Sequence, residues 1–405
     1  MARTTVRTGF ALLAAAVLSG CWLQPGNDAE RSGFAPLESG ITAANVNQLQ
    51  LDWSRQFAAP TSAPAVTIDG VFVSSGGTLY RLAPTDGATQ WSAQEFAART
   101  LFSLQQPTVT GGVVYVAQSG FSIFPGTIMR FNESTGAPLS ALDGAGADLT
   151  QRGSLLVSTE SAGNSNQIGI SRLFVTDLAG TASWKTYIAI VTGHVPVSTS
   201  AAVSNNRIFL GNESNVLAYP IAEPAACPTF TSGEICPPAW TSPAGSAVQF
   251  HPVLTSDHQT VIAPTQSSIV ALDTGNGALR WTGTLASKPS AAPAVAGAYV
   301  YVPTISGQLA VFSAAGCGAP TCTPVWTAQT GSSIGQPPSI TSGGLVYTGS
   351  DDGSIHAYSA SGCGSPTCTS LWSVATGSKI TGGPVNALGR VFVGTVDGRI
   401  IAYSL

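Results

Sequence analysis

The sequence predicts an all-β fold, an eight-bladed β-propeller of four-stranded antiparallel blades. The first observation is a repeated unit, clearest in residues 335–372, with a proline-containing start, two short apolar strands, an Asp-Gly turn and a closing Trp. The second is its period, because closing Trp residues lie 41 positions apart from Trp240 to Trp281 and 56 apart from Trp184 to Trp240. Such periods with four strands each are typical of propellers. The third is that Trp53 stands in an isolated closing strand, whereas the last unit has none, so we expect the strand near Trp53 to close the ring.

Each unit contains two alternating apolar segments that read as half-buried strands. We expect these pairs at residues 70–73 and 79–82, 112–116 and 127–131, 155–157 and 173–175, 207–210 and 216–219, 261–263 and 269–273, 299–302 and 309–312, 343–347 and 352–358, and 390–393 and 399–403. The third unit carries a longer insertion, and in the second unit Leu139 is the candidate for the place of the missing Trp. Pairs such as Asp352-Gly353 and Asn276-Gly277 suit tight hairpin turns.

Composition excludes several classes of protein. The 405 residues are 44% hydrophobic and only 9% charged, so material for a core is ample. Forty-five Gly and 26 Pro favour many turns and short strands over long helices. A net charge of −4 provides no basic surface for nucleic acid, and no such partner is predicted.

The N-terminus has the features of an export signal. Arg3 and Arg7 precede a short apolar stretch, residues 10–18, well below the roughly 20 apolar residues of a spanning helix. The tetrapeptide Leu-Ser-Gly-Cys at residues 18–21 resembles the lipobox of bacterial lipoproteins, in which the Cys is lipidated; an ordinary secretory signal is the alternative. We therefore expect a signal peptide at residues 1–20, lipidation of Cys21, a flexible tether at residues 21–45 and the propeller at residues 46–405. Trp22 follows Cys21 where an Asp would be an inner-membrane signal, which favours the outer membrane if the cell has two.

The other six cysteines form three local pairs. They are Cys227 with Cys236, Cys317 with Cys322, and Cys363 with Cys368. Close pairs in an exported chain indicate disulfides. Zinc is the competing interpretation, but the spacing is looser than C-x₂-C and no His lies near any pair.

The repeat also resembles a known family. The unit follows the pattern Gly-x-Leu-Tyr-Ala-Leu-Asp and then x-x-Gly-x-x-x-Trp, which is similar to the PQQ-type, or quinoprotein-like, propeller repeat. Residues 268–281 are the closest match to it in this chain. The resemblance extends over about residues 48–405. It implies one of two functions. The family includes periplasmic quinoprotein dehydrogenases, and it also includes the non-catalytic lipoprotein of the outer-membrane β-barrel assembly machinery. The dehydrogenases hold PQQ under two adjacent cysteines beside a calcium ion, and this chain has no Cys-Cys pair.

Candidate catalytic motifs have simpler structural interpretations. The fixed place of Trp53, Trp91, Trp184, Trp240, Trp281, Trp326 and Trp372 in the repeat indicates packing between blades, not a ligand cage. Residues 331–335 match G-x-S-x-G, but a serine hydrolase needs a strand, a sharp turn and a helix there. Asp351 and Asp352 are explained by hairpin turn chemistry, without calcium. His194, His251, His258 and His356 show no metal-binding spacing.

The favoured hypothesis is an exported, lipid-anchored, non-catalytic scaffold for envelope proteins that acts in outer-membrane or cell-envelope protein assembly, with no cofactor and no metal site. Residues 121–125, 162–170 and 227–236 are its candidate contact loops, since long loops frequently carry binding sites. The alternatives are a binding module for a small molecule or glycan and, less favoured, a PQQ-dependent dehydrogenase.

Overall fold

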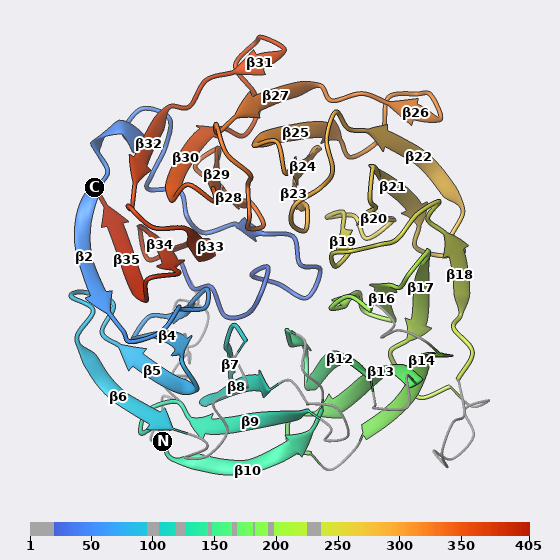
Figure 1. Ribbon diagram of the computed structural model, residues 1–405, viewed down its shortest axis with the longest axis horizontal. Helices are drawn as coiled ribbons and strands as arrows, with labels where there is room; N and C mark the ends of the chain where they lie inside the picture. Colours follow the sequence, from blue (N-terminus) through green and yellow to red (C-terminus); the bar gives the residue numbers. More distant parts are fainter. Residues whose placement is uncertain are drawn as a thin grey trace, which may run out of the picture.

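Eight sheets form a ring around a central axis, which Figure 1 shows in a view down that axis. The computed structural model describes residues 20–94, 105–118, 126–144, 148–163, 168–180, 183–192, 198–224 and 236–405. Within each sheet, four antiparallel strands follow one another from the axis to the rim. The predicted eight-bladed propeller is confirmed.

Blades 1 to 4 follow the chain in order, with the innermost strand first. Blade 1 comprises β3 (Ala65–Thr67), β4 (Gly70–Ser75), β5 (Thr78–Leu82) and β6 (Thr89–Gln94). Blade 2 comprises β7 (Thr108–Thr110), β8 (Val113–Gln118), β9 (Thr127–Asn132) and β10 (Pro138–Asp143). Blade 3 comprises β11 (Thr150–Arg152), β12 (Leu155–Gly163), β13 (Ile168–Asp177) and β14 (Ser183–Thr192). Blade 4 comprises β15 (Ala202–Val203), β16 (Arg207–Gly211), β17 (Asn215–Pro220) and β18 (Trp240–Pro243).

Blades 5 to 8 repeat the arrangement. Blade 5 comprises β19 (Val253–Leu254), β20 (Thr260–Pro264), β21 (Ser268–Asp273) and β22 (Leu279–Thr284). Blade 6 comprises β23 (Ala294–Ala296), β24 (Tyr299–Pro303), β25 (Gln308–Ser313) and β27 (Trp326–Gln329). Blade 7 comprises β28 (Ser339–Thr341), β29 (Leu345–Gly349), β30 (Ser354–Ser359) and β32 (Trp372–Ala375). Blade 8 comprises β33 (Ile380–Ala387), β34 (Arg390–Thr395), β35 (Arg399–Ser404) and the N-terminal strand β2 (Gln50–Gln56).

The ring is closed by β2, as the isolated Trp53 predicts. This strand pairs antiparallel with the C-terminal strand β35, from Gln50 opposite Ser404 to Gln56 opposite Arg399. The first and last strands of the propeller therefore share one sheet, and closure leaves no open end of the array to cap.

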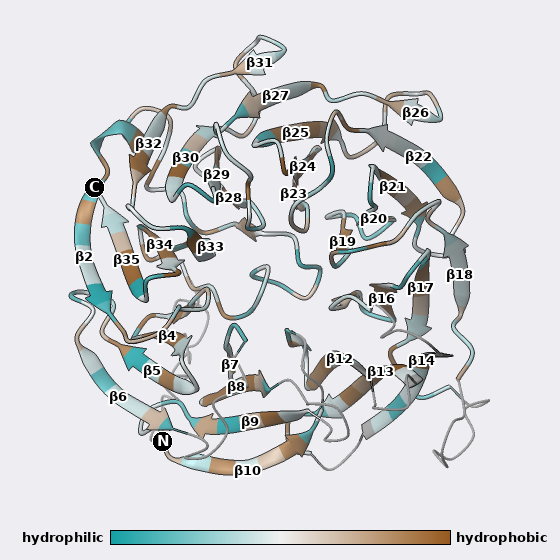
Figure 2. Ribbon diagram, in the orientation of Figure 1, coloured by the Kyte–Doolittle hydropathy of each residue, from teal (hydrophilic) through white to brown (hydrophobic). Residues whose placement is uncertain are grey.

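Apolar residues of the middle strands fill the space between blades, and Figure 2 shows the brown, hydrophobic segments along them. The closing Trp residues pack between neighbouring blades. Trp53 is 7% exposed, and its indole donates to the carbonyl of Pro84 at 2.9 Å in the next blade. Gly87 lies over this ring with φ of +67°, and a Cβ there would come within 2.5 Å of Trp53. Only glycine satisfies both the turn and this close contact.

Blade 2 differs from expectation in one residue. Leu142, which is 6% exposed, lies against Gly180 of blade 3, whereas Leu139 is 40% exposed. The register of β10 against β9 shifts between Leu139 and Leu142. The shift amounts to one residue, because three steps along β10 correspond to two along β9. Leu142, and not Leu139, packs against the next blade, so the choice of Leu139 as the Trp substitute was wrong.

Two predicted disulfides are confirmed, and each loop lies on the preceding blade. Cys317 bonds to Cys322 and Cys363 to Cys368, each with a Cα–Cα distance of 5.7 Å. The short strands β26 (Thr321–Cys322) and β31 (Thr367–Cys368) pair parallel with β22 and β27. In the third pair, Cys227 lies outside the described residues, whereas Cys236 is buried.

The segment expected to be a flexible tether lies inside the ring. Residues 20–38, which we call the plug, cross the centre of the propeller, seen as the blue trace in Figure 1. Its strand β1 (Phe34–Ala35) pairs parallel with β28. After the plug, a 3₁₀ turn, η1 (Val46–Gln48), leads to β2. The prediction of a flexible tether at residues 21–45 therefore does not match the structure.

Every blade contributes a hydrogen bond to the plug. Oxygen atoms of Gly20, Trp22, Leu23, Gln24, Ala29, Glu30, Ser32 and Gly33 accept from the backbone N–H groups of Leu388, Val66, Val109, Gln151, Val203, Leu254, Val295 and Ile340, respectively, at 2.7–3.1 Å. These donors lie in or directly after the innermost strand of each blade. Innermost strands have no further strand on the axial side, and the plug satisfies groups that would otherwise need water.

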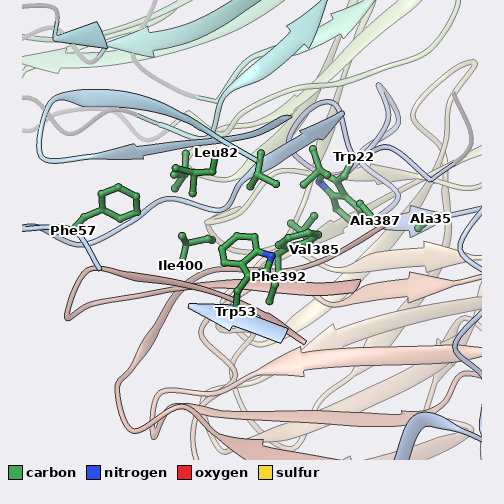
Figure 3. Close-up of a cluster of buried hydrophobic side chains, with 13 residues drawn as sticks. Trp22, Ala35, Trp53, Phe57, Leu82, Val385, Ala387, Phe392 and Ile400 are labelled. Carbon is green, nitrogen blue, oxygen red and sulfur yellow. The ribbon is translucent and has the colours of Figure 1, made fainter. Parts of the chain in front are cut away.

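Trp22 also joins the hydrophobic core. It is 4% exposed and belongs to a cluster with Val66, Val385 and Phe392 from blades 1 and 8. Figure 3 shows Trp22 close to Val385 and Ala387, with Trp53 and Phe392 further toward the rim. The plug is therefore fixed by side-chain packing as well as by backbone hydrogen bonds.

Candidate functional site

The two faces of the ring are distinguished by their turns. In each blade, the turns after the first and third strands lie on one face, and the turn after the second strand lies on the other with the connections between blades. Cys21 lies on the first face, since Gly20 bonds to Leu388 and Trp22 to Val66, next to the innermost turns of blades 8 and 1. We call this the anchor face and the opposite one the cup face.

A cavity of about 730 Å³ occupies the centre of the ring above the plug. Its wall includes connections between blades and the turn at residues 74–77, and its floor includes Trp22, Gly26, Arg31 and Gly33 of the plug. These are cup-face elements, so the channel is a cup that the plug closes from below. We take this cup and its rim as the candidate functional site.

Three titratable side chains meet at the cavity. Arg31 comes from the plug, Asp148 from the connection between blades 2 and 3, and His251 from that between blades 4 and 5. Arg31 is 1% exposed, and its Nη1 lies 3.6 Å from Asp148 Oδ2. Each of these residues comes from a different part of the chain, and only the ring brings them together.

Arg31 fixes the plug to the wall of the cup. Its Nε donates to Thr150 Oγ1 at 3.0 Å and to the carbonyl of Ala201 at 2.9 Å, and its Nη2 donates to the carbonyl of Asp148 at 3.0 Å. Among the described residues, Nη1 has no hydrogen-bond partner although it is buried. Burial lowers the pKa of Arg31, and the Asp148 carboxylate opposes that effect.

His251 is held in its neutral form. Burial, together with the nearby Arg31 charge, lowers the pKa of His251 to about 3. Its Nδ1 lies 3.2 Å from the carbonyl oxygen of Pro252. The cup floor therefore presents a paired cation and anion beside an uncharged imidazole, an arrangement suited to hydrogen bonding with a polar ligand.

We expect His251 to lower the free energy of unfolding at acidic pH. His251→Asn should remove this part of the pH dependence. As the pH falls, the unfolded chain protonates this residue near 6.5, but the folded chain does so only near 3. Between these values the unfolded state binds more protons, so the free energy of unfolding falls by up to about 1.4 kcal/mol per pH unit. Urea unfolding at a series of pH values measures the slope.

The pH slope of the variant must be compared with that of the parent, because protonation of Asp28 changes the free energy of unfolding in the opposite direction. Burial raises the pKa of Asp28 to about 6, so its protonation favours the folded state between about pH 4 and 6. The Asp28 effect is common to both proteins and cancels in the difference. Equal slopes for the parent and His251→Asn would contradict the prediction.

The other motifs singled out in the sequence do not join this site. Residues 331–335 form the connection from β27 to β28, with no helix after Ser333. Asp352 Oδ1 accepts from the N–H of Ser354 at 2.8 Å, as expected of a hairpin turn. His258 and His356 lie in blades 5 and 7, and His194 lies outside the described residues. Among the described residues, no group of three or more His, Cys, Asp or Glu side chains is placed to hold a metal ion.

The cavity does not fit a PQQ–calcium site. Of the described residues that line it, Asp148 is the single carboxylate, and Arg31 already pairs with it. The plug occupies the floor, and the disulfides at Cys317 and Cys363 link residues five positions apart, not adjacent ones. We derive no reaction step through that cofactor.

Sequence reasoning missed the plug and hence the floor of the cup. One signal was available, because Asp28, Glu30 and Arg31 place three charges within four residues of a chain that is only 9% charged. The structure uses all three. Asp28 accepts from the N–H of Ser32 at 2.8 Å, Glu30 pairs with Arg152, and Arg31 bonds to blades 3 and 4.

Fold and site together define the class of protein, a repeat propeller whose central channel is closed by its own N-terminal segment. The family model described as "Outer membrane protein assembly factor BamB" matches residues 38–226, 175–318 and 313–405. The chain therefore belongs to this family of PQQ-repeat propellers. A search of curated proteins found no match.

Solved structures show the same fold at low sequence identity. A europium-containing methanol dehydrogenase is 13% identical with a TM-score of 0.69, covering 96% of this chain and 98% of that one. A quinohemoprotein alcohol dehydrogenase from Comamonas testosteroni is 13% identical with a TM-score of 0.67, covering 96% and 81%. BamB from Moraxella catarrhalis is 14% identical with a TM-score of 0.60, covering 88% and 98%. At these identities the likeness concerns the fold alone.

Proposed function

We propose that this protein is an exported, lipid-anchored, non-catalytic scaffold that binds envelope proteins through its cup face, in the assembly of outer-membrane proteins. The observation that carries the proposal is the family membership, whose description is an outer-membrane assembly factor. Cys21 on the opposite face supports it, because a lipid there would leave the cup face free. No helix of the described residues has the length and hydropathy needed to cross a bilayer.

The third blade offers the most extended contact surface on the cup face. Its strands β12 and β13 pair continuously from Leu155 opposite Asp177 to Gly163 opposite Gly169. They have 9 and 10 residues, whereas the equivalent strands of blade 1 have 6 and 5. The ends of these strands contain residues 162–163 and 168–170 of the predicted contact loop, and residues 164–167 lie outside the described residues. The loop at residues 121–125 lies outside the described residues, as does the loop at 227–236 apart from Cys236.

Photocrosslinking in whole cells tests the scaffold. We expect a photoreactive amino acid at Ser161 or Ile305, both exposed on the cup face, to attach components of the barrel-assembly machinery, which mass spectrometry identifies. The matched controls are exposed anchor-face positions, Asp86 and Leu279, which should attach no envelope protein. Normal assembly of barrel proteins in cells that lack this chain would count against the proposal.

The cup itself supports a second candidate, a module that binds a small polar molecule or glycan. The observations in its favour are the volume of about 730 Å³ and the buried Nη1 of Arg31, which has no hydrogen-bond partner among the described residues. Cup-face probes that attach no protein, combined with a ligand-induced rise in melting temperature, would favour this candidate over the scaffold.

A further inference from the structure

Exposed apolar side chains are unequally divided between the two faces. Ten large hydrophobic side chains of the described residues are at least 40% exposed. Ile305 and Val396 lie in turns between second and third strands, which belong to the cup face. The other eight are on the anchor face, namely Leu37, Leu51, Ile68, Leu139, Leu279, Val325, Leu371 and Leu405.

Their places in the fold establish this assignment. Ile68 lies in the turn between β3 and β4, and Leu37 precedes Glu38, whose carbonyl accepts from Gly343 in the turn between β28 and β29. The remaining six lie at the anchor-face ends of the third and fourth strands. Leu51, Leu139, Leu279, Val325 and Leu371 lie at or directly before the start of a fourth strand, and Leu405 follows the end of β35.

The plug fixes the position of Cys21 on the same face. The next residue, Trp22, is 4% exposed and exchanges two backbone hydrogen bonds with Val66, at 2.8 and 2.7 Å. A free tether of residues 21–45 would reach about 85 Å when extended. Instead, a lipid on Cys21 would bring Ile68 and Leu37 to the bilayer with it.

The charged side chains of the anchor face do not attract it to a lipid bilayer, so an attraction to the bilayer must come from apolar contact. Arg152 pairs with Glu30, Arg280 with Asp273 at 2.7 Å, and Arg390 with Asp52 at 2.6 Å. Asp69, Asp86 and Glu133 add negative charge in the turns of this face. A neutral to acidic surface gains nothing from acidic lipid headgroups, so the contact suits a zwitterionic surface.

We propose that the anchor face rests on the lipid bilayer, with Leu37, Ile68 and the rim side chains such as Leu371 at the membrane interface. The axis of the ring then stands upright on the membrane, and the cup opens away from it. This inference rests on the lipid anchoring of the proposed function. It adds a second membrane contact, made by the folded propeller, and fixes which face partners can reach.

Environment-sensitive fluorescent labels test the orientation. Single Cys replacements Ile68→Cys and Leu371→Cys report the anchor face, and Ile305→Cys and Val396→Cys are controls of similar exposure on the cup face. The lipidated protein is placed on phosphatidylcholine vesicles, and each label is read with and without a lipid-borne quencher. We expect a blue shift and loss of most emission to the quencher at residues 68 and 371, and neither effect at 305 and 396.

A second form of the protein separates this inference from the lipid anchor. Cys21→Ser with a hexahistidine segment before residue 21 is bound to vesicles that contain a nickel-chelating lipid, which attaches the chain at the same point. Mass spectrometry of the native protein shows separately whether Cys21 carries acyl chains. Absence of acyl chains overturns the anchoring, but labels at residues 68 and 371 that still enter the membrane support the contact.

Three results would overturn the orientation. One is equal solvent exposure of all four labels on anchored protein. Another is quenching at residues 305 and 396 in place of 68 and 371. The last is protection of residues 68 and 371 only after an envelope protein is added, which would make the anchor face a protein interface.

Discussion

Replacing Arg31 with Ala is expected to lower the free energy of unfolding by about 3–5 kcal/mol. The side chain is 1% exposed, and its nitrogen atoms donate to Thr150, Ala201 and Asp148. Removing it takes these donors away from Thr150 and from the carbonyl oxygens of Asp148 and Ala201, and it leaves the partly exposed Asp148 carboxylate without its cation. Each buried group that is left unsatisfied adds its own desolvation cost. Urea unfolding followed by Trp fluorescence measures the change.

Two control variants show whether the loss of stability is specific to the Arg31 side chain. Arg31→Lys keeps the charge but loses the fork of donors, so we expect an intermediate loss. Arg55→Ala, on the exposed surface of β2, should leave stability nearly unchanged. If Arg31→Ala and Arg55→Ala unfold at the same urea concentration, Arg31 does not hold the plug in the ring.

Trp53→Ala is expected to cost about 3–5 kcal/mol and to loosen the junction between the two ends of the chain. Trp53 is 7% exposed, contacts the Phe392 ring at a centroid distance of 5.9 Å, and bonds to Pro84 of blade 1. It therefore joins blade 8 to blade 1 at the place where the ring closes. Limited proteolysis should release the C-terminal blade before the rest of the propeller, alongside a lower urea midpoint.

The matched control lies in the same strand. Leu51 is 60% exposed, so Leu51→Ala removes apolar area from β2 without opening a cavity. We expect little change in its urea midpoint or its cleavage pattern. Equal sensitivity of the two variants to protease would indicate that the ring depends on backbone pairing of β2 with β35 and not on Trp53.

The blades could be predicted from the sequence because their signals are local. Alternating strands, Asp-Gly turns and a closing Trp recur within each unit, and Trp53 without a unit of its own indicated closure. The two disulfides also follow from close spacing. Even so, spacing did not show that each disulfide loop lies on the preceding blade, because that contact joins two separate units.

The sequence by itself thus determined the number of blades, the closing strand and the paired cysteines. Only the tertiary structure decided where residues 20–38 lie and how Arg31, Asp148 and His251 are arranged. The plug has no periodicity, and its partners are eight innermost strands spread from Val66 to Leu388. Those donors face the axis only after the ring has closed, so nothing within the segment itself distinguishes a plug from a tether.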